Sequence, residues 1–230
     1  DVRRELTWRW LTPQDMDTIQ ELEDIIEEAL HDNSLYCRDT VEDILYSMAQ
    51  GAGSIGGFVE GQLVCVRFVS FPGKYNLAER VIEPQYWDRV LHLESIIVHP
   101  DFRGNALQVR SFYYLLAHLP TEVKYLFSTV SPYNLPSLKS MFKYGSVGVD
   151  IRCLYPTEDE PEGVLRYVGV RGLIEQTDFR YETIRRTDID RQIELLNEGY
   201  VATGLLSDDE VRFQKVLRTA VPMRPLRERQ

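Results

Sequence analysis

One segment of the sequence combines residue types that suit the binding of a phosphate group. The segment IIVHPDFRGNALQ (residues 96–108) starts as a β-branched run and ends in the features of a helix start. A turn that opens a helix points several unpaired backbone N–H groups in one direction, and the helix dipole adds partial positive charge there. Gly104 permits unusual backbone angles, and Arg103 supplies a cation. The segment predicts an anion site; the alternative is a helix-start turn without a ligand.

Glu94 precedes this turn and is the candidate general base. Period-two alternation places it on one strand face with Ile96 and Val98. Burial of a carboxylate on a central strand raises its pKa toward the range that suits a base. The alternative is a solvated carboxylate or an ion pair with an arginine such as Arg67, and the sequence leaves both open.

The elements that must position these residues alternate along the chain. Apolar spacing of about 3.6 residues predicts helices, and β-branched or alternating runs predict strands. The predicted fold class is α/β, with a mixed, twisted sheet flanked by helices. The predicted strands are 6–11, 54–60, 62–71, 91–98, 124–130, 147–155 and 164–172, and the predicted helices are 13–30, 41–49, 105–118 and 136–144.

The pattern changes after Leu173. A helix is predicted up to Glu198, followed by a hairpin of strands 200–206 and 211–217 across the turn SDDE. The sequence therefore predicts three parts. Residues 1–173 form the main domain, 174–220 form a C-terminal extension packed on it, and 221–230 form a flexible tail.

Two motifs resemble those of the GCN5-related N-acetyltransferase (GNAT) superfamily, over about residues 6–172. IIVHPDFRGNALQ is similar to the acyl-CoA signature V-x-P-x-x-R-G-x-G-x-G/A. NLPSLKSMFKYG (residues 134–145) is similar to the second signature, N-x-x-(A/S)-x-x-x-Y-x-K-x-G. The resemblance implies a GNAT-like fold, an acyl-CoA co-substrate and no metal. It also implies an N-acyltransferase that moves an acetyl group from acetyl-CoA to an amine of a small molecule by direct attack.

The resemblance also implies roles for individual residues. Glu94 would remove the amine proton, directly or through water. Backbone and side-chain groups after it would hold the cofactor. The implied cofactor-binding residues are Ile96, Ile97, Val98, Arg103, Gly104, Asn105, Ala106, Leu107, Gln108 and Asn134.

The sequence departs from the family signatures at four positions. Ala106 and Gln108 stand at glycine-type positions; alanine is a mild change there, because a helix N-terminus tolerates it. Met141 replaces the tyrosine that serves as the general acid, and Ser146 replaces an aromatic residue. Ser131, Tyr133 or Tyr144 are candidate replacement acids, and the sequence does not choose among them. The alternative function is therefore a catalytically impaired CoA-binding or protein-interaction module of the same fold.

Charge and cysteine content narrow the class of partner. Residues 1–60 hold 14 Asp and Glu against 4 Lys and Arg, and the rest of the chain is neutral. This distribution disfavours nucleic acid and anionic membranes. It suits a cationic amine acceptor, or equally a pair of solvated helix faces. Three unclustered cysteines and the lack of an apolar run of about 18 residues predict a cytoplasmic protein. Homodimerisation, for example through the extension, is left open.

Overall fold

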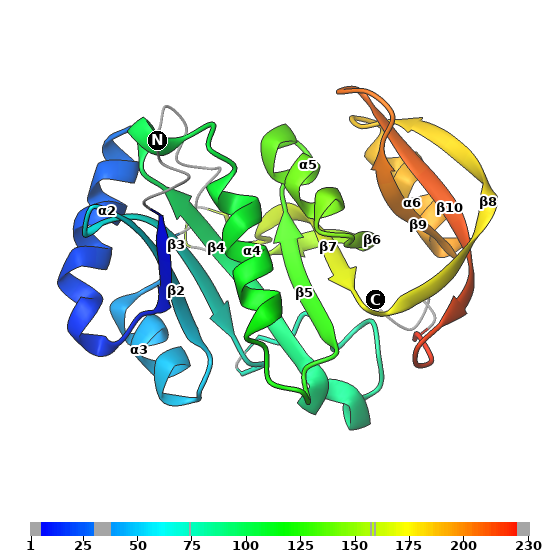
Figure 1. The fold of residues 1–230 in the computed structure, drawn as a ribbon. Helices are drawn as coiled ribbons and strands as arrows, with labels where there is room; N and C mark the ends of the chain where they lie inside the picture. Colours follow the sequence, from blue (N-terminus) through cyan, green and yellow to red (C-terminus); the bar gives the residue numbers. More distant parts are fainter. Residues whose placement is uncertain (1–5, 30–37, 74, 157, 159, 225–230) are drawn as a thin grey trace. The chain divides into compact units, whose positions relative to one another are not determined.

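The computed structural model describes residues 6–29, 38–73, 75–156, 158 and 160–224 (Figure 1). The chain divides into two units, which are described separately. The first unit comprises Asp1–Phe71 with Leu93–Pro120, and the second comprises Pro72–His92 with Thr121–Gln230. The boundaries predicted from the sequence at residues 173 and 220 are a different division and stay a prediction.

The strands of the first unit follow the order β1-β2-β3-β4. β2 pairs antiparallel with both β1 and β3. The predicted hairpin is confirmed: Glu60 and Gly61 turn with φ of 50° and 84°, the positive values that a tight two-residue turn requires. The strands are β1 (Thr7–Trp10), β2 (Gly53–Val59), β3 (Gln62–Ser70) and β4 (Val90–Val98), of which β4 contributes its residues from Leu93 onward.

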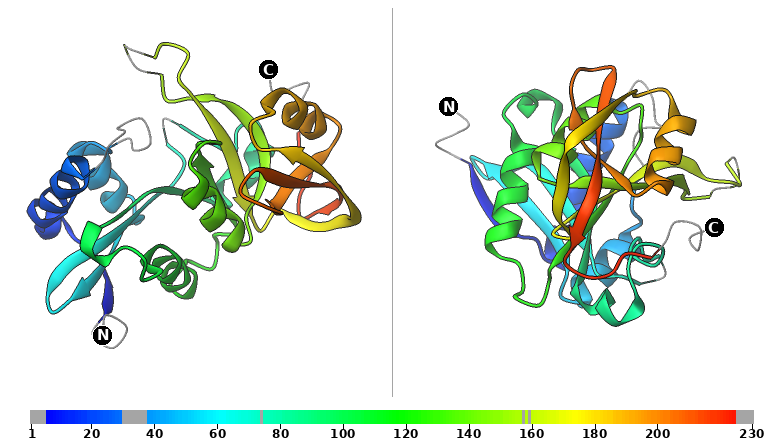
Figure 2. Two further views of the ribbon diagram at one scale, coloured as in Figure 1. Left: turned by 90° about the horizontal axis from the view of Figure 1, so that it is seen from above. Right: turned by 90° about the vertical axis from the view of Figure 1, so that its right-hand side faces the viewer.

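Helices cover both faces of these strands. Ile19 and Leu22 of α2 pack in one cluster with Phe68 and Ile97, whereas Leu107 of α4 packs on the opposite face. Figures 1 and 2 show α2 and α3 on one side of β2 and β3, and α4 on the other. The helices are α2 (Met16–Glu28), α3 (Val41–Ala49) and α4 (Leu107–Ala117), and a 3-10 turn, η4 (Pro100–Phe102), precedes α4.

Side-chain hydrogen bonds stabilise the turn before α2 and the start of α3. The Thr12 backbone N–H donates to the Asp15 carboxylate at 2.8 Å, in a 3-10 turn that leads into α2. The Thr40 hydroxyl accepts from the Asp43 backbone N–H at 3.1 Å at the start of α3. Each cap satisfies a backbone donor that has no partner inside the helix.

The second unit has the strand order β5-β7-β6-β9-β10-β8, in which neighbouring strands pair antiparallel. The C-terminal extension continues these strands, because Gly148 of β6 pairs with Ala202 of β9. Figure 2 shows α6 lying against β9 and β10. The elements are β5 (Tyr125–Val130), α5 (Leu135–Lys143), β6 (Val147–Leu154), β7 (Val164–Arg171), β8 (Ile174–Arg185), α6 (Ile189–Asn197), β9 (Tyr200–Leu205) and β10 (Glu210–Thr219).

Two features of this unit were not expected. β8 is a strand of 12 residues that the sequence analysis did not predict, and it forms the end of the strand order beside β10. The expectation of a flexible tail from residue 221 is wrong for its first part. Val221 is buried, Met223 pairs with Ile82, and the Arg224 guanidinium donates to the Glu79 carbonyl at 2.9 Å. Residues 225–230 lie outside the described residues.

Candidate functional site

The turn between β4 and α4 has the backbone shape that the phosphate-site prediction requires. Gly104 has φ 80°, and a Cβ added to it would meet no atom within 4 Å. Ala106 is the N-cap of α4, with φ 55° and ψ 28°. Arg103 is exposed beside them. Two left-handed residues on either side of Asn105 therefore bend the chain sharply just before the helix begins.

The conformation of Ala106 corrects one expectation. Alanine was expected to be tolerated because it would lie inside the helix start, but the residue lies before the helix in the left-handed region. An L-residue costs about 1–2 kcal/mol there, whereas glycine does not. Strain of this kind is concentrated at functional sites, where the surrounding structure maintains it.

The first turn of α4 is open to an anionic ligand. No side chain of the residues described in this unit caps the helix. The Asn105 side-chain amide instead donates to the carbonyls of Phe102 and Arg103, at 3.1 and 3.4 Å, and so holds the turn itself. The backbone N–H groups of a helix start without a side-chain cap suit a phosphate group. The residues present therefore fit the pyrophosphate of coenzyme A.

Several predicted cofactor residues have buried side chains, so only their backbones are suited to ligand contact. Leu107 and Ile97 are each 2% exposed and lie in the apolar core. Ile96 and Val98 are half-buried against the cluster on the α4 side. The alternation predicted for Ile96, Ile97 and Val98 is thus confirmed. The Gln108 carbonyl accepts from the Arg67 guanidinium at 2.7 Å, below the first turn.

Glu94 lies in a polar cluster on β3 and β4. The Ser70 hydroxyl donates to Glu94 Oε1 at 2.5 Å. On the neighbouring residue, the Ser95 hydroxyl donates to Asp39 Oδ2 at 3.1 Å. Burial, together with the negative charges of Glu94, Glu23 and Asp43, raises the pKa of Asp39 to about 6, although the bond from Ser95 acts in the opposite direction. The candidate general base Glu94 therefore lies close enough to a second carboxylate, that of Asp39, for the two charges to interact.

Sequence reasoning missed Asp39 and gave Arg67 only a minor place. Asp39 directly precedes the helix cap Thr40, and nothing in its local sequence distinguishes it from the other acids of this region. Arg67 was considered only as a partner of Glu94, yet its guanidinium donates hydrogen bonds to Ser111 and Gln108 of α4. A single arginine within the apolar run LVCVRFVSF was the available signal for a buried cation.

The residues of the second signature lie in the second unit and are described there. Asn134 caps α5, because its side-chain oxygen accepts from the Ser137 backbone N–H at 3.1 Å. Met141 is 2% exposed and packs on β7, so that a Cβ added to Gly169 would lie 2.6 Å from its sulfur. Of the candidate replacement acids, Tyr144 is buried and Tyr133 is 58% exposed.

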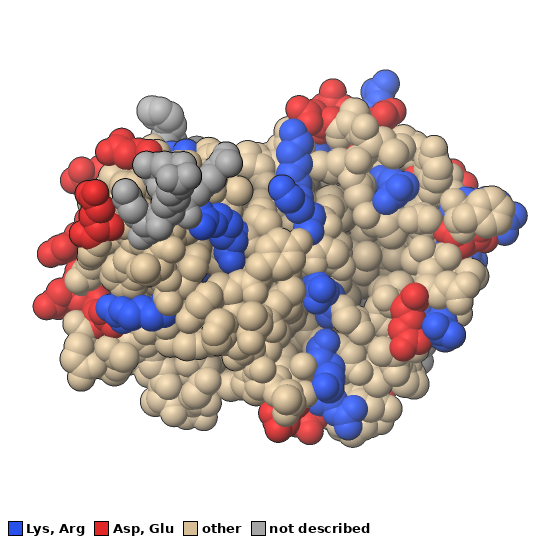
Figure 3. Space-filling view, in the orientation of Figure 1, with Lys and Arg blue, Asp and Glu red and all other residues tan. Residues whose placement is uncertain are grey.

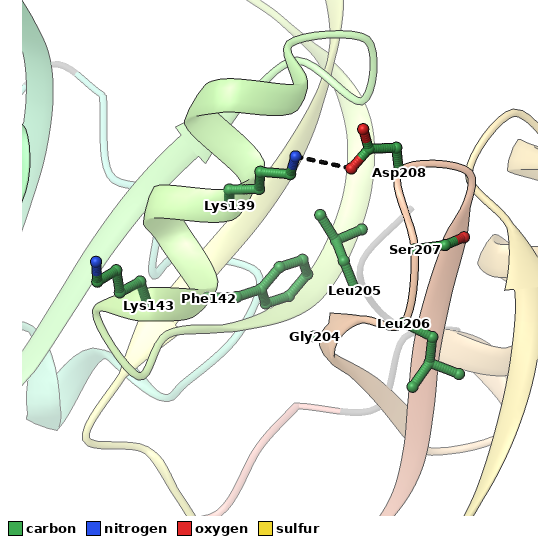
Figure 4. Close-up of a pocket in the computed structure, with 8 residues that line it drawn as sticks. All are labelled: Lys139, Phe142, Lys143, Gly204, Leu205, Leu206, Ser207 and Asp208. Carbon is green, nitrogen blue, oxygen red and sulfur yellow. Dashed lines mark ion pairs between the residues drawn. The ribbon is translucent and has the colours of Figure 1, made fainter. Parts of the chain in front are cut away.

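A groove in the second unit was not predicted. It has a volume of about 450 Å³ and lies between α5 and the turn that joins β9 to β10 (Figure 4). Lys139 Nζ and Asp208 Oδ1 form an ion pair of 2.7 Å across it. Phe142 and Leu205 supply apolar surface, and none of the predicted site residues lines the groove.

Acidic side chains gather over α2, at the left of Figure 3. Asp17, Glu21 and Glu28 are exposed there. The Arg38 guanidinium forms ion pairs with Asp24, Glu27 and the buried Glu23, at 2.9, 3.3 and 3.0 Å, and so neutralises part of this charge.

The structure is similar to solved acetyltransferases and to a GNAT-like decarboxylase. It matches yncA from Salmonella typhimurium, solved with its cofactor acetyl-CoA, with a TM-score of 0.54 and 14% identity over 75% of this chain and 96% of that chain. It matches aminoglycoside acetyltransferase AAC(6')-Ib, in complex with coenzyme A and kanamycin, with a TM-score of 0.50 and 17% identity over 73% and 94%. It matches the GNAT-like decarboxylase GphF, in complex with isobutyryl-CoA, with a TM-score of 0.53 and 14% identity over 72% and 98%.

These matches confirm the predicted fold class, a mixed α/β sheet flanked by helices with the GNAT fold. The shared part is about three quarters of this chain, the extent over which the sequence resembles the superfamily. No protein-family model and no curated protein matches the sequence. In the part of the chain that the structure describes, no helix is long and apolar enough to cross a membrane.

Proposed function

We propose that the protein is an acyl-CoA-dependent N-acyltransferase that moves an acetyl group from acetyl-CoA to an amine of a small molecule. The observation that carries the proposal is the start of α4. Gly104 and Ala106 adopt left-handed conformations there, and the helix has no side-chain cap, in a fold whose solved neighbours hold acetyl-CoA, CoA or isobutyryl-CoA. This arrangement suits a pyrophosphate without a metal or a capping side chain.

Bound acetyl-CoA would supply the activated thioester carbonyl. In the proposed reaction, Glu94, directly or through water, accepts a proton from the ammonium form of the acceptor, and the neutral nitrogen then bonds to the carbonyl carbon. The Ser70 hydroxyl orients the Glu94 carboxylate. Backbone N–H groups near Ile97 and Val98 stabilise the negative oxygen of the intermediate. The carbon–sulfur bond then breaks, the sulfur leaves as a thiolate, and the remaining extra proton of the nitrogen passes to water.

The acceptor we propose is a cationic amine. The exposed acids of α2 and the carboxylates of Asp39 and Glu94 favour a positive ligand over a neutral one. Raising the ionic strength from about 0.01 M to about 0.15 M shortens the Debye length from about 30 Å to about 8 Å. The KM for a cationic acceptor is therefore expected to rise with salt, and a flat profile would contradict this part of the proposal.

A second candidate is a CoA-binding module that has lost transferase activity. The specific observation in its favour is Met141, which replaces the family's tyrosine acid and is packed against β7. This candidate predicts CoA binding without acyl transfer to any amine.

Two measurements test the proposal. Calorimetric titration with acetyl-CoA and with CoA is expected to give saturable micromolar binding, and a screen of cationic amines is expected to find an acceptor. Glu94→Gln should then lower kcat about a hundredfold, the usual scale for loss of a general base, and leave CoA binding intact. Glu182→Gln, an exposed glutamate on β8, is the matched control and should change neither quantity. Failure to bind either ligand would refute both candidates.

A further inference from the structure

Arg67 is a buried cation beneath the first turn of α4. It lies in the apolar strand β3 and is 1% exposed. Its Nη2 donates to the Gln108 carbonyl at 2.7 Å, and its Nε donates to the Ser111 hydroxyl at 3.0 Å. Gln108 is the second residue of the helix whose start forms the proposed phosphate site.

The position of this cation is fixed by several contacts. The Ser111 hydroxyl itself donates to the Gln108 carbonyl at 2.9 Å, which closes a ring of hydrogen bonds. The Arg67 guanidinium carbon lies 5.8 Å from the centre of the Phe112 ring, a distance that suits a cation–π interaction. All of these partners belong to α4, so Arg67 ties β3 to the helix and holds its first turn.

Burial gives Arg67 an electrostatic effect that the exposed Arg103 lacks. Water and salt screen a surface charge strongly, but they screen a buried charge much less. The charge of Arg67 affects a neighbouring group. Burial raises the pKa of the Cys65 thiol to about 12, and the Arg67 cation partly opposes this rise because it stabilises the thiolate. The cation adds to the positive end of the α4 dipole.

We propose that Arg67 is a positioning and electrostatic residue for the pyrophosphate of coenzyme A. It acts through the first turn of α4 and supplies a fixed positive charge below it. The inference rests on the proposed function. At an effective dielectric constant of about 20, a unit charge within about two helical turns changes the dissociation constant of an anion about tenfold.

The test compares coenzyme A with pantetheine, which lacks the pyrophosphate. Arg67→Gln keeps a donor for the Gln108 carbonyl but removes the charge. It should raise the dissociation constant for CoA about tenfold by calorimetry, and change that for pantetheine less than twofold by NMR titration. Arg67→Lys restores the charge, and CoA affinity should return to within about threefold of the wild-type value. Ser111→Ala removes a partner of Arg67 and not the charge, and should also stay within threefold.

Each outcome decides the inference. Equal losses of affinity for CoA and for pantetheine would mean that Arg67 only maintains the local structure. Unchanged CoA affinity in Arg67→Gln would mean that the charge of Arg67 does not contribute to binding. Either result overturns the inference. If Arg67→Gln does not fold, Arg67→Lys decides, because lysine keeps the charge: CoA affinity within about threefold of the wild-type value supports the inference, and a loss of tenfold or more overturns it. If the wild-type protein does not bind CoA, the proposed function fails first and the inference fails with it.

Discussion

Asp39→Asn is expected to stabilise the protein at neutral pH and to have little effect in acid. In the folded protein the pKa of Asp39 is about 6, against 3.8 for the unperturbed side chain. Each unit of difference corresponds to about 1.4 kcal/mol, which gives an upper bound of about 3 kcal/mol. Asp39 is only partly buried, so solvent screening reduces the expected gain to roughly 1–2 kcal/mol. The asparagine can still accept from the Ser95 hydroxyl.

The sign follows from proton binding. Because the folded-state pKa is raised, the folded protein binds more protons than the unfolded chain between about pH 4 and pH 6. The free energy of unfolding of the wild-type protein therefore loses this contribution as the pH rises through that window. The variant has no such loss, so its advantage should grow from pH 4 to pH 8.

Urea unfolding of both proteins at pH 4, 6 and 8 measures this difference, because other titrating groups cancel between them. Asp88→Asn, at a carboxylate with 76% side-chain exposure, is the control and should change stability by less than about 0.5 kcal/mol at every pH. An Asp39→Asn gain that is equal at pH 4 and pH 8, or a loss at pH 8, would refute the assignment of burial and acidic neighbours as the cause.

Three substitutions test the backbone and core around the site. Ala106→Gly removes the strain of an alanine in the left-handed region and is expected to raise the free energy of unfolding by up to about 1 kcal/mol, measured in a thermal melt. No gain would show that Ala106 is not strained in this turn. Gly169→Ala places a Cβ 2.6 Å from the Met141 sulfur and should cost about 1–3 kcal/mol in the wild-type background but much less in the Met141→Ala background; equal losses in the two backgrounds would contradict this contact. Met141→Tyr should cost stability in unfolding experiments without raising kcat, and a faster enzyme would show that this position reaches the reaction.

The sequence predicted the elements whose signals are local. Thr40 caps α3, Thr12 begins the 3-10 turn that leads into α2, and the Glu60-Gly61 turn joins the predicted strands 54–60 and 62–71. The helix and hairpin of the extension are α6 and the pair β9 and β10. These features depend on caps, turn residues and periodicity within a few residues, which is the information that a single sequence contains.

The features that were missed depend on contacts between distant residues. β8 has the sequence IEQTDFRYETIR, which shows no alternation of polar and apolar residues because most of it is exposed; β10 supplies its pairing. The connection at 72–89 has no period, yet its Leu77, Val81 and Ile82 are buried in the core of the second unit. Asp39 and Arg67 acquire their environments from strands and helices far away in the chain, so their electrostatics could not be predicted from local pattern.

The proposed reaction depends less on the general acid, which is missing at position 141, than on the general base Glu94. A thiol has a pKa of about 8.5, so a thiolate leaves readily near neutral pH without a proton donor. The ammonium form of an alkyl amine has a pKa of about 10.4, so only about one molecule in a few thousand is unprotonated at pH 7, and the nitrogen must lose a proton before it can attack. Removing that proton is therefore the more demanding transfer. Met141 cannot donate a proton to the leaving sulfur. The Glu94 carboxylate, which accepts a hydrogen bond from the Ser70 hydroxyl, is still available to remove the proton of the amine. The departure at position 141 is thus compatible with turnover, whereas loss of Glu94 is not expected to be.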